Sequence, residues 1–274
     1  MSKPDLSDEE IQALIAEIRA SPKYRDINLP VETLKDLIYR ESYHYKKVKD
    51  VKQAVKKKLH NIVAPYLGDP DYEQASYEME AAFREGEDSS KSFCLKMLNL
   101  HASTKERIPI MEQFYERIFS ETGLPGSILD LACGLNPFAL PWMGIPEKTK
   151  YYPYDLNYPR VQLINQFFGY LNRPQTAIYQ DILVNPPKMA ADLAFFFKEA
   201  HRFDQRQKGC NRDFWISLPV RKIVVSLPTS SLTGKHDKME QHQRLVYEAI
   251  ENLNWPVQEI ILQSEIIFII QKEA

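Results

Sequence analysis

The pattern of apolar and polar positions changes near residue 122 of the 274-residue chain. Before it, apolar residues recur every three or four positions, which predicts amphipathic helices. The first helix should begin after Ser7, because Glu10 follows three residues later in the order of a capping box. The helices expected in this part cover residues 7–20, 31–41, 45–63, 71–84, 91–101 and 104–120.

After residue 122, short apolar runs alternate with helical stretches near 158–171 and 198–210. This alternation predicts a parallel, doubly wound sheet that binds ligands at the carboxyl ends of its strands. The last two runs are too close together for a helical crossover, so they should pair antiparallel. The expected strands cover residues 127–131, 151–155, 176–181, 191–197, 222–228, 257–262 and 265–270.

The first expected strand stops at a turn that contains a single glycine, Gly134. Glycine lets the backbone approach a ligand closely, and Pro137 suits the start of a helix after the turn. A dinucleotide-binding turn would need three glycines, so a pyrophosphate site is not expected. One glycine after a strand that contains an acid, here Asp130, is typical of S-adenosylmethionine (SAM) methyltransferases. The alternative is an ordinary strand-to-helix turn.

Carboxylates end the next two expected strands. Asp155 stands where an acid accepts hydrogen bonds from ribose hydroxyls, and Asp181 could receive the exocyclic amine of adenine. A lone aspartate at a strand end is more often a turn cap. The register of these strands favours the nucleoside site over the cap.

Composition narrows the class of protein. The chain is 44% hydrophobic and 26% charged, which is enough for one sizeable core and a smaller domain. No apolar run approaches the length of a membrane span, and the first residues lack the apolar stretch of a signal peptide. We therefore expect a soluble cytoplasmic protein with no membrane partner. The three cysteines are far apart and the six histidines include no H-E-x-x-H pair, so no metal site is expected.

The net charge is only −2, but the charges are unevenly distributed. Seven lysines and one acid lie between Ser42 and His60, whereas eight acids and one base lie between Asp69 and Ser90. A basic face can be drawn to phosphate, although a lysine run is more often only a solvated helix face. Apolar residues in the basic stretch are spaced as one buried stripe, which leaves the lysines together outside. The stripe consists of Val48, Val51, Val55 and Leu59.

Two longer stretches of sequence resemble one particular protein family. Residues 100–107 read L-H-A-S-T-K-E-R, and residues 129–140 read L-D-L-A-C-G-L-N-P-F-A-L. They resemble the aminoglycoside-resistance 16S rRNA (guanine-N7) methyltransferases, and further matches cover the chain in the family's order. These matches lie at residues 21–25, 58–66, 180–183, 225–229 and 265–268.

The resemblance implies a fold, a cofactor and a partner. The fold is α/β, a seven-stranded Rossmann-like SAM methyltransferase domain preceded by an all-helical N-terminal region. Its expected parts are an rRNA-docking subdomain at 1–66, a second helical subdomain at 67–122 and the methyltransferase domain at 123–274. The enzyme would form N7-methylguanosine in the decoding site of 16S rRNA, within the assembled 30S subunit, and so give aminoglycoside resistance. We expect a monomer.

The resemblance also assigns roles to residues. Arg107 would bind the methionine carboxylate of SAM, with a buried salt bridge as the alternative. Glu265 would face the target base, or else be a solvent-facing residue of an edge strand. The residues implied to bind the cofactor are His101, Arg107, Ala132, Gly134, Asp155, Asp181, Ile182 and Phe197. Those implied to position the base are Lys198, Ser226, Pro228 and Glu265, and those implied to bind rRNA are Lys46, Lys47, Lys49, Lys56, Lys57 and Lys58.

The chemistry needs no general base. The sulfonium of SAM makes its methyl group electrophilic, and guanine N7 carries a lone pair that needs no deprotonation. Rate must then come mostly from proximity and orientation. The chain departs from the family near the target base, at residues 198–204 and 228–238. Two alternatives therefore stay open: a divergent 30S-binding homologue with another target nucleotide or weak activity, and a noncatalytic SAM-binding ribosome-assembly protein.

Overall fold

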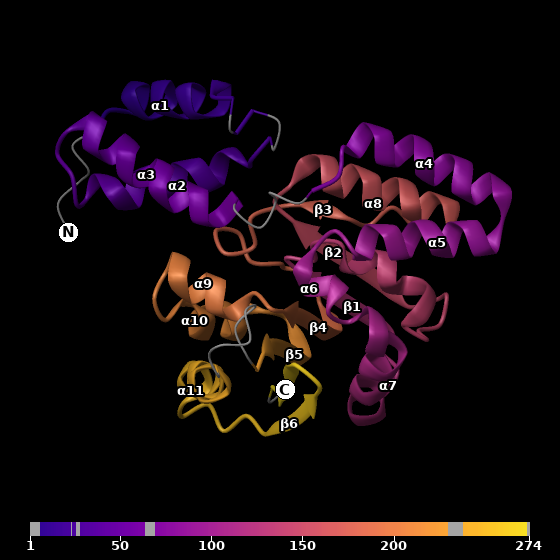
Figure 1. Cartoon of the computed structure of the whole chain (residues 1–274). Coiled ribbons are helices and arrows are strands. Elements are labelled where there is room, and N and C mark those ends of the chain that lie inside the picture. The colour runs from indigo at the N-terminus through magenta and orange to yellow at the C-terminus, as the bar shows by residue number, and fades with distance from the viewer. Residues whose placement is uncertain (1–5, 23, 26–27, 64–68, 230–237, 273–274) are drawn as a thin grey trace.

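One mixed sheet forms the centre of the C-terminal half. The computed structural model describes residues 6–22, 24–25, 28–63, 69–229 and 238–272. Within them, seven strands lie in the order β3-β2-β1-β4-β5-β7-β6 (Figure 1). The first five are parallel, and β7 runs antiparallel to both of its neighbours. Their bounds are β1 Ser127–Leu131, β2 Lys150–Asp155, β3 Ile178–Tyr179, β4 Ala191–Phe197, β5 Val220–Pro228, β6 Val257–Leu262 and β7 Glu265–Gln271.

The predicted strands and the antiparallel final pair are confirmed. β3 is shorter than the expected 176–181, because only its two central residues pair with β2. The direction of the strand order reverses between β1 and β4. In doubly wound sheets such a reversal opens a crevice at the carboxyl ends of the strands, and ligands bind there.

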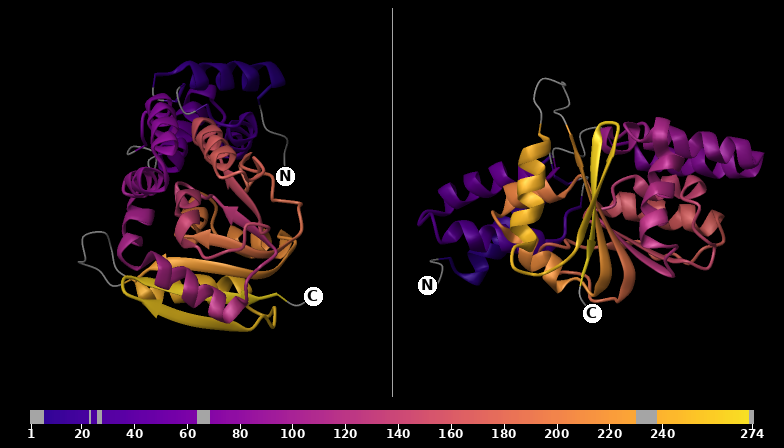
Figure 2. Two further views of the ribbon diagram at one scale, coloured as in Figure 1. Left: turned by 90° about the vertical axis from the view of Figure 1, so that its right-hand side faces the viewer. Right: turned by 90° about the horizontal axis from the view of Figure 1, so that it is seen from below.

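Helices cover both faces of the sheet, as the view from below in Figure 2 shows. On one face α4, α5, α7, α8 and the 3-10 helix η3 share an apolar core with the strands, and on the other face α9, α10 and α11 do so. Side chains alternate along β4, so Phe195 and Phe197 enter the first core and Phe196 the second. The bounds are α4 Tyr72–Glu85, α5 Glu87–Leu98, α7 Met111–Thr122, η3 Asn136–Trp142, α8 Tyr158–Tyr170, α9 Ala200–Arg206, α10 Cys210–Ser217 and α11 Met239–Ile250.

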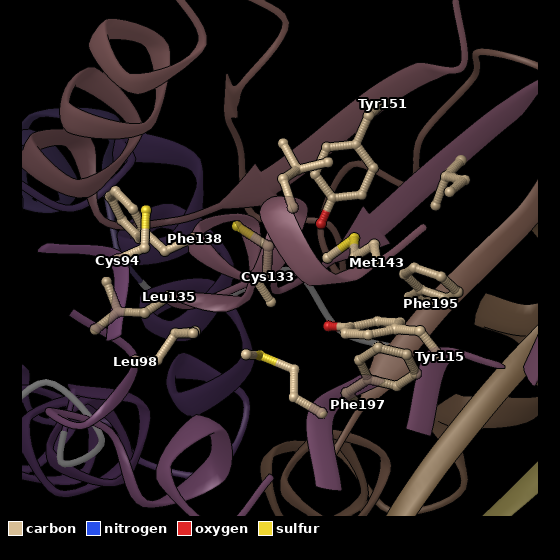
Figure 3. Packing of buried hydrophobic residues seen from close by; sticks show 14 of the residues in the cluster. Cys94, Leu98, Tyr115, Cys133, Leu135, Phe138, Met143, Tyr151, Phe195 and Phe197 are labelled. Atoms are coloured by element: carbon tan, nitrogen blue, oxygen red, sulfur yellow. The ribbon is translucent and has the colours of Figure 1, made fainter. Parts of the chain in front are cut away.

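The helices between residues 72 and 122 share their core with the sheet. Cys94 and Leu98 of α5 lie beside Phe138 of η3, and Tyr115 of α7 lies beside Phe195 of β4 (Figure 3). The ring centroids of Tyr115 and Phe195 are 6.3 Å apart. The helices of the expected second helical subdomain therefore pack on one face of the sheet and share one hydrophobic core with it.

The first three helices, α1 (Asp8–Ala20), α2 (Val31–Ser42) and α3 (Val48–Val63), have a core of their own. The predicted capping box is present: the Ser7 hydroxyl accepts from the Glu10 amide at 3.2 Å, and the Glu10 carboxylate accepts from the Ser7 amide at 2.8 Å. Val48 was expected in the buried stripe of α3, but it is 36% exposed because the helix only begins there. The residues buried on α3 are Val51, Val55, Leu59 and Val63.

Two predicted helices are interrupted. The helix expected at 198–210 is α9, which ends at Arg206. Gly209, with a left-handed φ of 75°, separates it from α10, which begins at Cys210 and lies beyond the expected range. The segment expected as 104–120 divides into α6 (Ala102–Lys105), η2 (Ile108–Ile110) and α7, because Pro109 has no N–H to continue a helix. Helix α11 was not predicted. Among the described residues, no helix is long and apolar enough to span a membrane.

The unit formed by α1, α2 and α3 rests against the carboxyl ends of the strands (Figure 1). The Thr33 hydroxyl donates to the Asp181 carboxylate at 2.7 Å, and the Tyr179 hydroxyl donates to the Asn28 carbonyl. Leu156, just after β2, packs against the core of this unit. The helical unit therefore covers the sheet edge at which ligands are expected.

Candidate functional site

A cavity of about 290 Å³ lies at the carboxyl ends of the parallel strands. Its walls come from the end of α3, the segment 101–107, the turn after β1 and helix α9. All of the residues predicted to bind the cofactor line this one cavity, although they are distant in sequence. They are His101, Arg107, Ala132, Gly134, Asp155, Asp181, Ile182 and Phe197.

The turn after β1 has two residues in the left-handed region. Ala132 has a φ of 52° and Gly134 a φ of 54°. A Cβ at Gly134 would meet His101 Nδ1 at 3.6 Å, an ordinary contact, so the backbone conformation is what requires glycine. The left-handed φ of Ala132 is costly for a residue with a side chain, and such strain collects at ligand sites. This turn brings backbone atoms to the cavity wall.

Asp155, at the end of β2, holds the turn in place. Its Oδ2 accepts from the Gly134 amide at 3.0 Å and from Arg160 Nη1 at 2.9 Å, and its Oδ1 accepts from the Asn157 amide at 2.8 Å. A carboxylate offers about four acceptor positions. Among the described residues these contacts leave one position on Oδ1, which is free to accept a ribose hydroxyl. The predicted contact with ribose stays a prediction.

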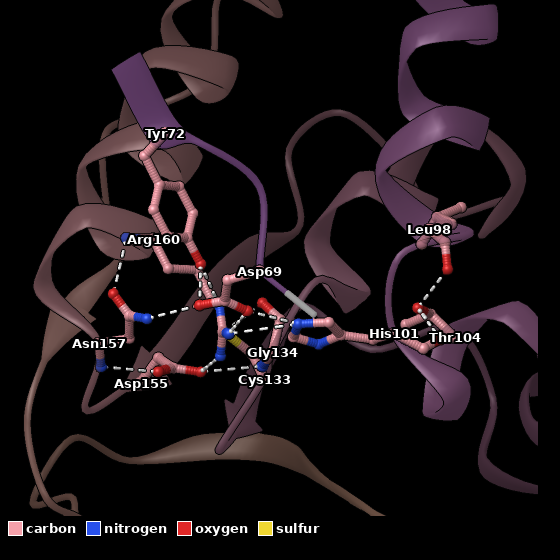
Figure 4. Close-up of polar contacts among 10 residues, drawn as sticks. All are labelled: Asp69, Tyr72, Leu98, His101, Thr104, Cys133, Gly134, Asp155, Asn157 and Arg160. Atoms are coloured by element: carbon pink, nitrogen blue, oxygen red, sulfur yellow. Dashed lines mark hydrogen bonds and ion pairs between the residues drawn. The ribbon is translucent and has the colours of Figure 1, made fainter. Parts of the chain in front are cut away.

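A polar cluster that we did not predict lies beside Asp155 (Figure 4). Asp69 Oδ1 lies 2.6 Å from both His101 Nε2 and Arg160 Nη2, and Asp69 Oδ2 accepts from Tyr72 OH and Asn157 Nδ2. Burial raises the pKa of Asp69, but Arg160, His101 and Tyr72 outweigh it and hold the pKa below its usual value. Apart from Tyr72, the partners of Asp69 are more than 30 positions away in the sequence. No local sequence pattern could therefore reveal the cluster.

Arg107 is buried between two aromatic rings. Its guanidinium carbon lies 4.5 Å from the Phe114 centroid and 4.4 Å from that of Phe197. Nη2 donates to Glu265 at 2.5 Å and to Ser226 at 2.9 Å, whereas among the described residues Nη1 has only a long contact of 3.5 Å with an amide oxygen. The buried salt bridge considered as an alternative is therefore present. Because Arg107 also lines the cavity, Nη1 keeps a donor for an anionic ligand.

The residues expected to position the target base gather behind Arg107. Glu265 is only 2% exposed and lies on β7, an inner strand, so it is not a solvent residue of an edge strand. Lys198 has a left-handed φ of 59°, donates to Glu106 and lies 3.4 Å from Glu265. Burial raises the pKa of Glu265, but Arg107 and Lys198 lower it below the usual value. None of the four residues, Lys198, Ser226, Pro228 and Glu265, is part of the cavity wall.

Asp181 is fully engaged by the protein. Its two oxygens accept from both terminal nitrogens of Arg206, at 2.9 and 2.7 Å, and from Thr33 and the amides of Leu183 and Val184. These contacts fill the acceptor positions of a carboxylate. In this arrangement Asp181 orders α9 and α2 at the cavity, and the predicted contact with the adenine amine stays a prediction.

Asp130 lies in the floor of the cavity and is 1% exposed. It accepts hydrogen bonds from Asn136 at 2.9 Å and from Tyr151. Burial raises its pKa to about 7 and outweighs these two contacts, which lower it. Close to neutrality this carboxyl therefore changes between its protonated and ionised forms.

The predicted rRNA-binding lysines divide into two groups. Lys46, Lys47, Lys49 and Lys57 are exposed, and Lys56 is half-buried. Lys58 instead pairs with the buried Glu41 at 2.5 Å and lines the cavity. Helix α3 therefore carries an outer basic surface and also contributes to the cavity wall.

The described part of the chain favours neither a metal-binding cluster nor a reactive thiol. No group of three or more histidine, cysteine or carboxylate residues there could hold a metal ion. Burial raises the pKa of the Cys133 thiol well above its usual value, so the reactive thiolate is disfavoured.

Comparisons with known proteins agree with this geometry. The model of the family described as ribosomal RNA methyltransferase (FmrO) matches residues 20–269. A "16S rRNA (guanine(1405)-N(7))-methyltransferase" of Serratia marcescens is 31% identical over 96% of this chain and 99% of its own length. One with the same description from Proteus mirabilis is 27% identical over 88% of this chain and 89% of its own length.

Solved structures give the same result. The 16S rRNA methylase RmtB is 28% identical, with a TM-score of 0.79 over 96% of this chain and 98% of its own. The 16S rRNA methyltransferase RmtF, solved in complex with S-adenosyl-L-homocysteine, is 27% identical, with a TM-score of 0.79 over 98% of this chain and 100% of its own. The predicted SAM methyltransferase fold and the predicted family are thus confirmed. The chain belongs to the FmrO family of ribosomal RNA methyltransferases.

Proposed function

We propose that this enzyme methylates N7 of a guanine in the decoding site of 16S rRNA, within the assembled 30S subunit. The observation that carries the proposal is the composition of the cavity wall. The SAM-type turn after β1 and the end of the lysine-rich helix α3 line the same cavity, so cofactor and rRNA would meet there. The relatives named as guanine-N7 methyltransferases of 16S rRNA support the choice of atom.

The cavity fits a cofactor with a nucleoside and an amino-acid end. Asp155 keeps one acceptor position, which suits a ribose hydroxyl, and Arg107 keeps a donor at Nη1, which suits a carboxylate. Between them, the turn at Ala132 and Gly134 presents backbone rather than bulky side chains. Ile182, buried in the same wall, offers an apolar surface for a base.

The reaction requires positioning more than proton transfer. SAM, when bound, supplies a methyl group that is already electrophilic. Guanine N7 uses a free lone pair, so no residue has to remove a proton before the methyl group is transferred. The protein's task is then to hold the two reactants in line and to exclude water, for which fixed geometry is the main requirement. Arg107, which lies between two aromatic rings and pairs with Glu265, gives that rigidity.

Docking is assigned to the exposed lysines of α3 and the turn before it. Lys46, Lys47, Lys49 and Lys57 are exposed. The helical unit that carries them contacts the sheet domain through the hydrogen bond from Thr33 to Asp181. A rigid ribosomal surface can present one guanine to the cavity if this unit binds neighbouring rRNA segments. We infer that one copy of the chain is sufficient, because the cavity wall is formed by residues of a single chain.

Methyl transfer from radiolabelled SAM tests the proposal. Intact 30S subunits should be labelled, naked 16S rRNA labelled little, and 50S subunits not at all. N7-methylguanosine carries a positive charge on the imidazole ring, so reduction followed by aniline should cut the rRNA at one decoding-site guanine. Cells that express the enzyme should resist gentamicin and kanamycin, because the added methyl group and charge disturb the contacts of these drugs with that base.

Two results would redirect the proposal. Label on an adenine or a ribose would refute the N7 assignment and keep the enzyme class. SAM binding without any transfer to 30S subunits would favour a noncatalytic ribosome-assembly role. In either case the departures from the family would be the first segments to exchange. They lie at 198–204, in and before α9, and at 228–238, where residues 230–237 are outside the described part of the structure.

A further inference from the structure

Three tyrosines are exposed where α2 ends and the chain turns into α3. Tyr39 is 48% exposed, Tyr43 40% and Tyr45 43%, and we call these residues the tyrosine patch. The rings of Tyr39 and Tyr43 meet edge to face, with centroids 5.2 Å apart and an interplanar angle of 83°. The Tyr43 hydroxyl donates to the Tyr39 hydroxyl at 2.8 Å. The edge-to-face contact orients two rings that solvent can reach.

The surroundings of the tyrosine patch are basic. Exposed Lys46, Lys47 and Lys49 directly follow Tyr45 along the chain. The two acids of α2 nearest in sequence are already neutralised, since Asp36 pairs with Arg40 at 2.8 Å and the buried Glu41 pairs with a lysine. The patch therefore combines aromatic faces with free positive charge, and it has no local excess of negative charge.

This combination matches the chemistry of unpaired RNA. In A-form duplexes the base edges are poorly accessible to side chains, whereas unpaired bases in loops, bulges and ends can be splayed out and stacked on aromatic rings. Lysines beside the rings bind the phosphates that flank such a base. Lysine side chains alone would bind phosphate without favouring unpaired nucleotides.

We propose that the tyrosine patch stacks on one or more unpaired nucleotides of 16S rRNA while the neighbouring lysines bind the adjacent phosphates. The proposal rests on the proposed function, because it takes the 30S subunit as the partner. It also specifies what the tyrosine patch recognises, namely unpaired nucleotides of the rRNA. A ribosomal protein at this surface would be a different partner, and the experiment below separates the two.

None of the three tyrosines is part of the cavity wall. Helix α3 begins at Val48, and its residues Lys58, Asn61 and Ile62 line the cavity. The three tyrosines are exposed, whereas Glu41, which lies between Tyr39 and Tyr43 and pairs with Lys58, is buried. Substitution of the tyrosines should therefore change affinity for the 30S subunit and leave the affinity for SAM unchanged.

The test compares a triple variant, Tyr39→Ala with Tyr43→Ala and Tyr45→Ala, with the parent enzyme. Affinity for 30S subunits is measured over a range of salt concentrations, and SAM affinity and thermal stability are measured beside it. The control is Tyr77→Ala, because Tyr77 is 63% exposed but lies on α4 in the acidic segment. A second triple variant, with phenylalanine at all three positions, keeps the rings and removes the hydroxyls.

We expect the alanine triple variant to lose roughly tenfold to hundredfold in 30S affinity, the range for loss of stacking on a base. The slope of log affinity against log salt should stay the same, because the lysines that bind phosphate are all retained. The phenylalanine variant and the Tyr77→Ala control should bind like the parent. Unchanged affinity of the alanine variant, or an equal loss in the phenylalanine variant, would overturn the stacking proposal.

Chemical probing identifies the partner. At saturating protein, one or more unpaired bases of 16S rRNA should be protected by the parent enzyme and by Lys46→Gln with Lys49→Gln, but not by the alanine triple variant. If no base protection depends on the tyrosines although affinity does, the patch contacts a ribosomal protein and the proposal is wrong. Failure of the proposed function is distinguishable, because the parent itself would then transfer no methyl group to 30S subunits.

Discussion

Charged residues concentrate in two regions of the molecule, and the two regions hold them differently. At the carboxyl ends of the strands, Arg107, Arg160 and Arg206 are almost fully buried, and each donates to a carboxylate at 2.9 Å or less. On α3 and in the turn before it, Lys46, Lys47, Lys49 and Lys57 extend into solvent. The arginines of the first region have fixed carboxylate partners, whereas these lysines of the second region lie in solvent.

The two regions differ because a charge has a different free-energy cost in the interior and in solvent. A buried ion must have a partner with good geometry, because desolvation costs several kcal/mol and only close, well-oriented contacts offset it. Arginine's planar fork suits such contacts. An exposed lysine has little cost and no fixed geometry, and its attraction for phosphate weakens as salt is added. Buried pairs therefore fix the shape of the cavity, and exposed lysines strengthen encounter with a large anion.

The largest effect should come from reversal of the exposed charges. Replacement of Lys46, Lys49, Lys56 and Lys57 by glutamate should abolish 30S binding, because attraction to phosphate becomes repulsion. SAM affinity and melting temperature should hardly change. The same four changed to glutamine should flatten the salt dependence by about 0.7–0.9 in log–log slope for each phosphate that is no longer neutralised. Retention of 30S affinity by the glutamate set would show that these lysines are only a solvated face.

Loss of a buried ion pair should instead lower the stability of the folded protein. Glu265→Ala leaves Arg107 buried without its carboxylate, so the free energy of unfolding should fall by about 3–5 kcal/mol. Denaturant unfolding measures this, with Glu116→Ala on the exposed side of α7 as the control. Salt should not restore the lost stability. A loss below about 1 kcal/mol would mean that water reaches Arg107 and that the pair does not stabilise the cavity.

A smaller effect is expected on the cofactor itself. Asp155→Ala removes both a predicted ribose acceptor and the partner of the Gly134 amide, so SAM affinity should weaken by about 1–3 kcal/mol. Titration calorimetry gives the affinity, and Asp213→Ala, on the exposed side of α10, is the matched control. Arg107→Ala should weaken SAM binding by a similar amount. If both variants bind SAM like the parent, the cofactor lies elsewhere.

The last effect, which is small for each pH unit, concerns the pH dependence of stability. Burial raises the pKa of Asp130 to about 7, so between about pH 4 and 7 the folded protein keeps a proton that the unfolded chain has released. The unfolded state then binds fewer protons, and stability falls as pH rises through this window, by at most about 1.4 kcal/mol per pH unit. Asp130→Asn should reduce this slope in denaturant unfolding series. An unchanged slope would show that another group titrates.

The sequence predicted the elements and the cavity residues better than their contacts. Strand patterns, the turn at Gly134 and the H-A-S-T-K-E-R string are local, so they can be read directly from neighbouring positions. The partner of Arg107 is 158 positions away at Glu265, and Asp69 meets Arg160 across 91 positions. Such pairs depend on strand order and helix packing. For the same reason the engagement of Asp181 by Arg206 could not be foreseen.

The shared wall of the cavity limits how this enzyme can be recombined with its relatives. The helical unit supplies Thr33 to Asp181, the Asn28 carbonyl to Tyr179, and Lys58 and Asn61 to the cavity itself. A chimera that exchanges residues before 64 would therefore receive a foreign set of surface lysines together with a foreign part of the cavity wall. The proposed docking surface and the shape of the cavity would thus change together, and a helical unit can be replaced only as a matched part of the whole.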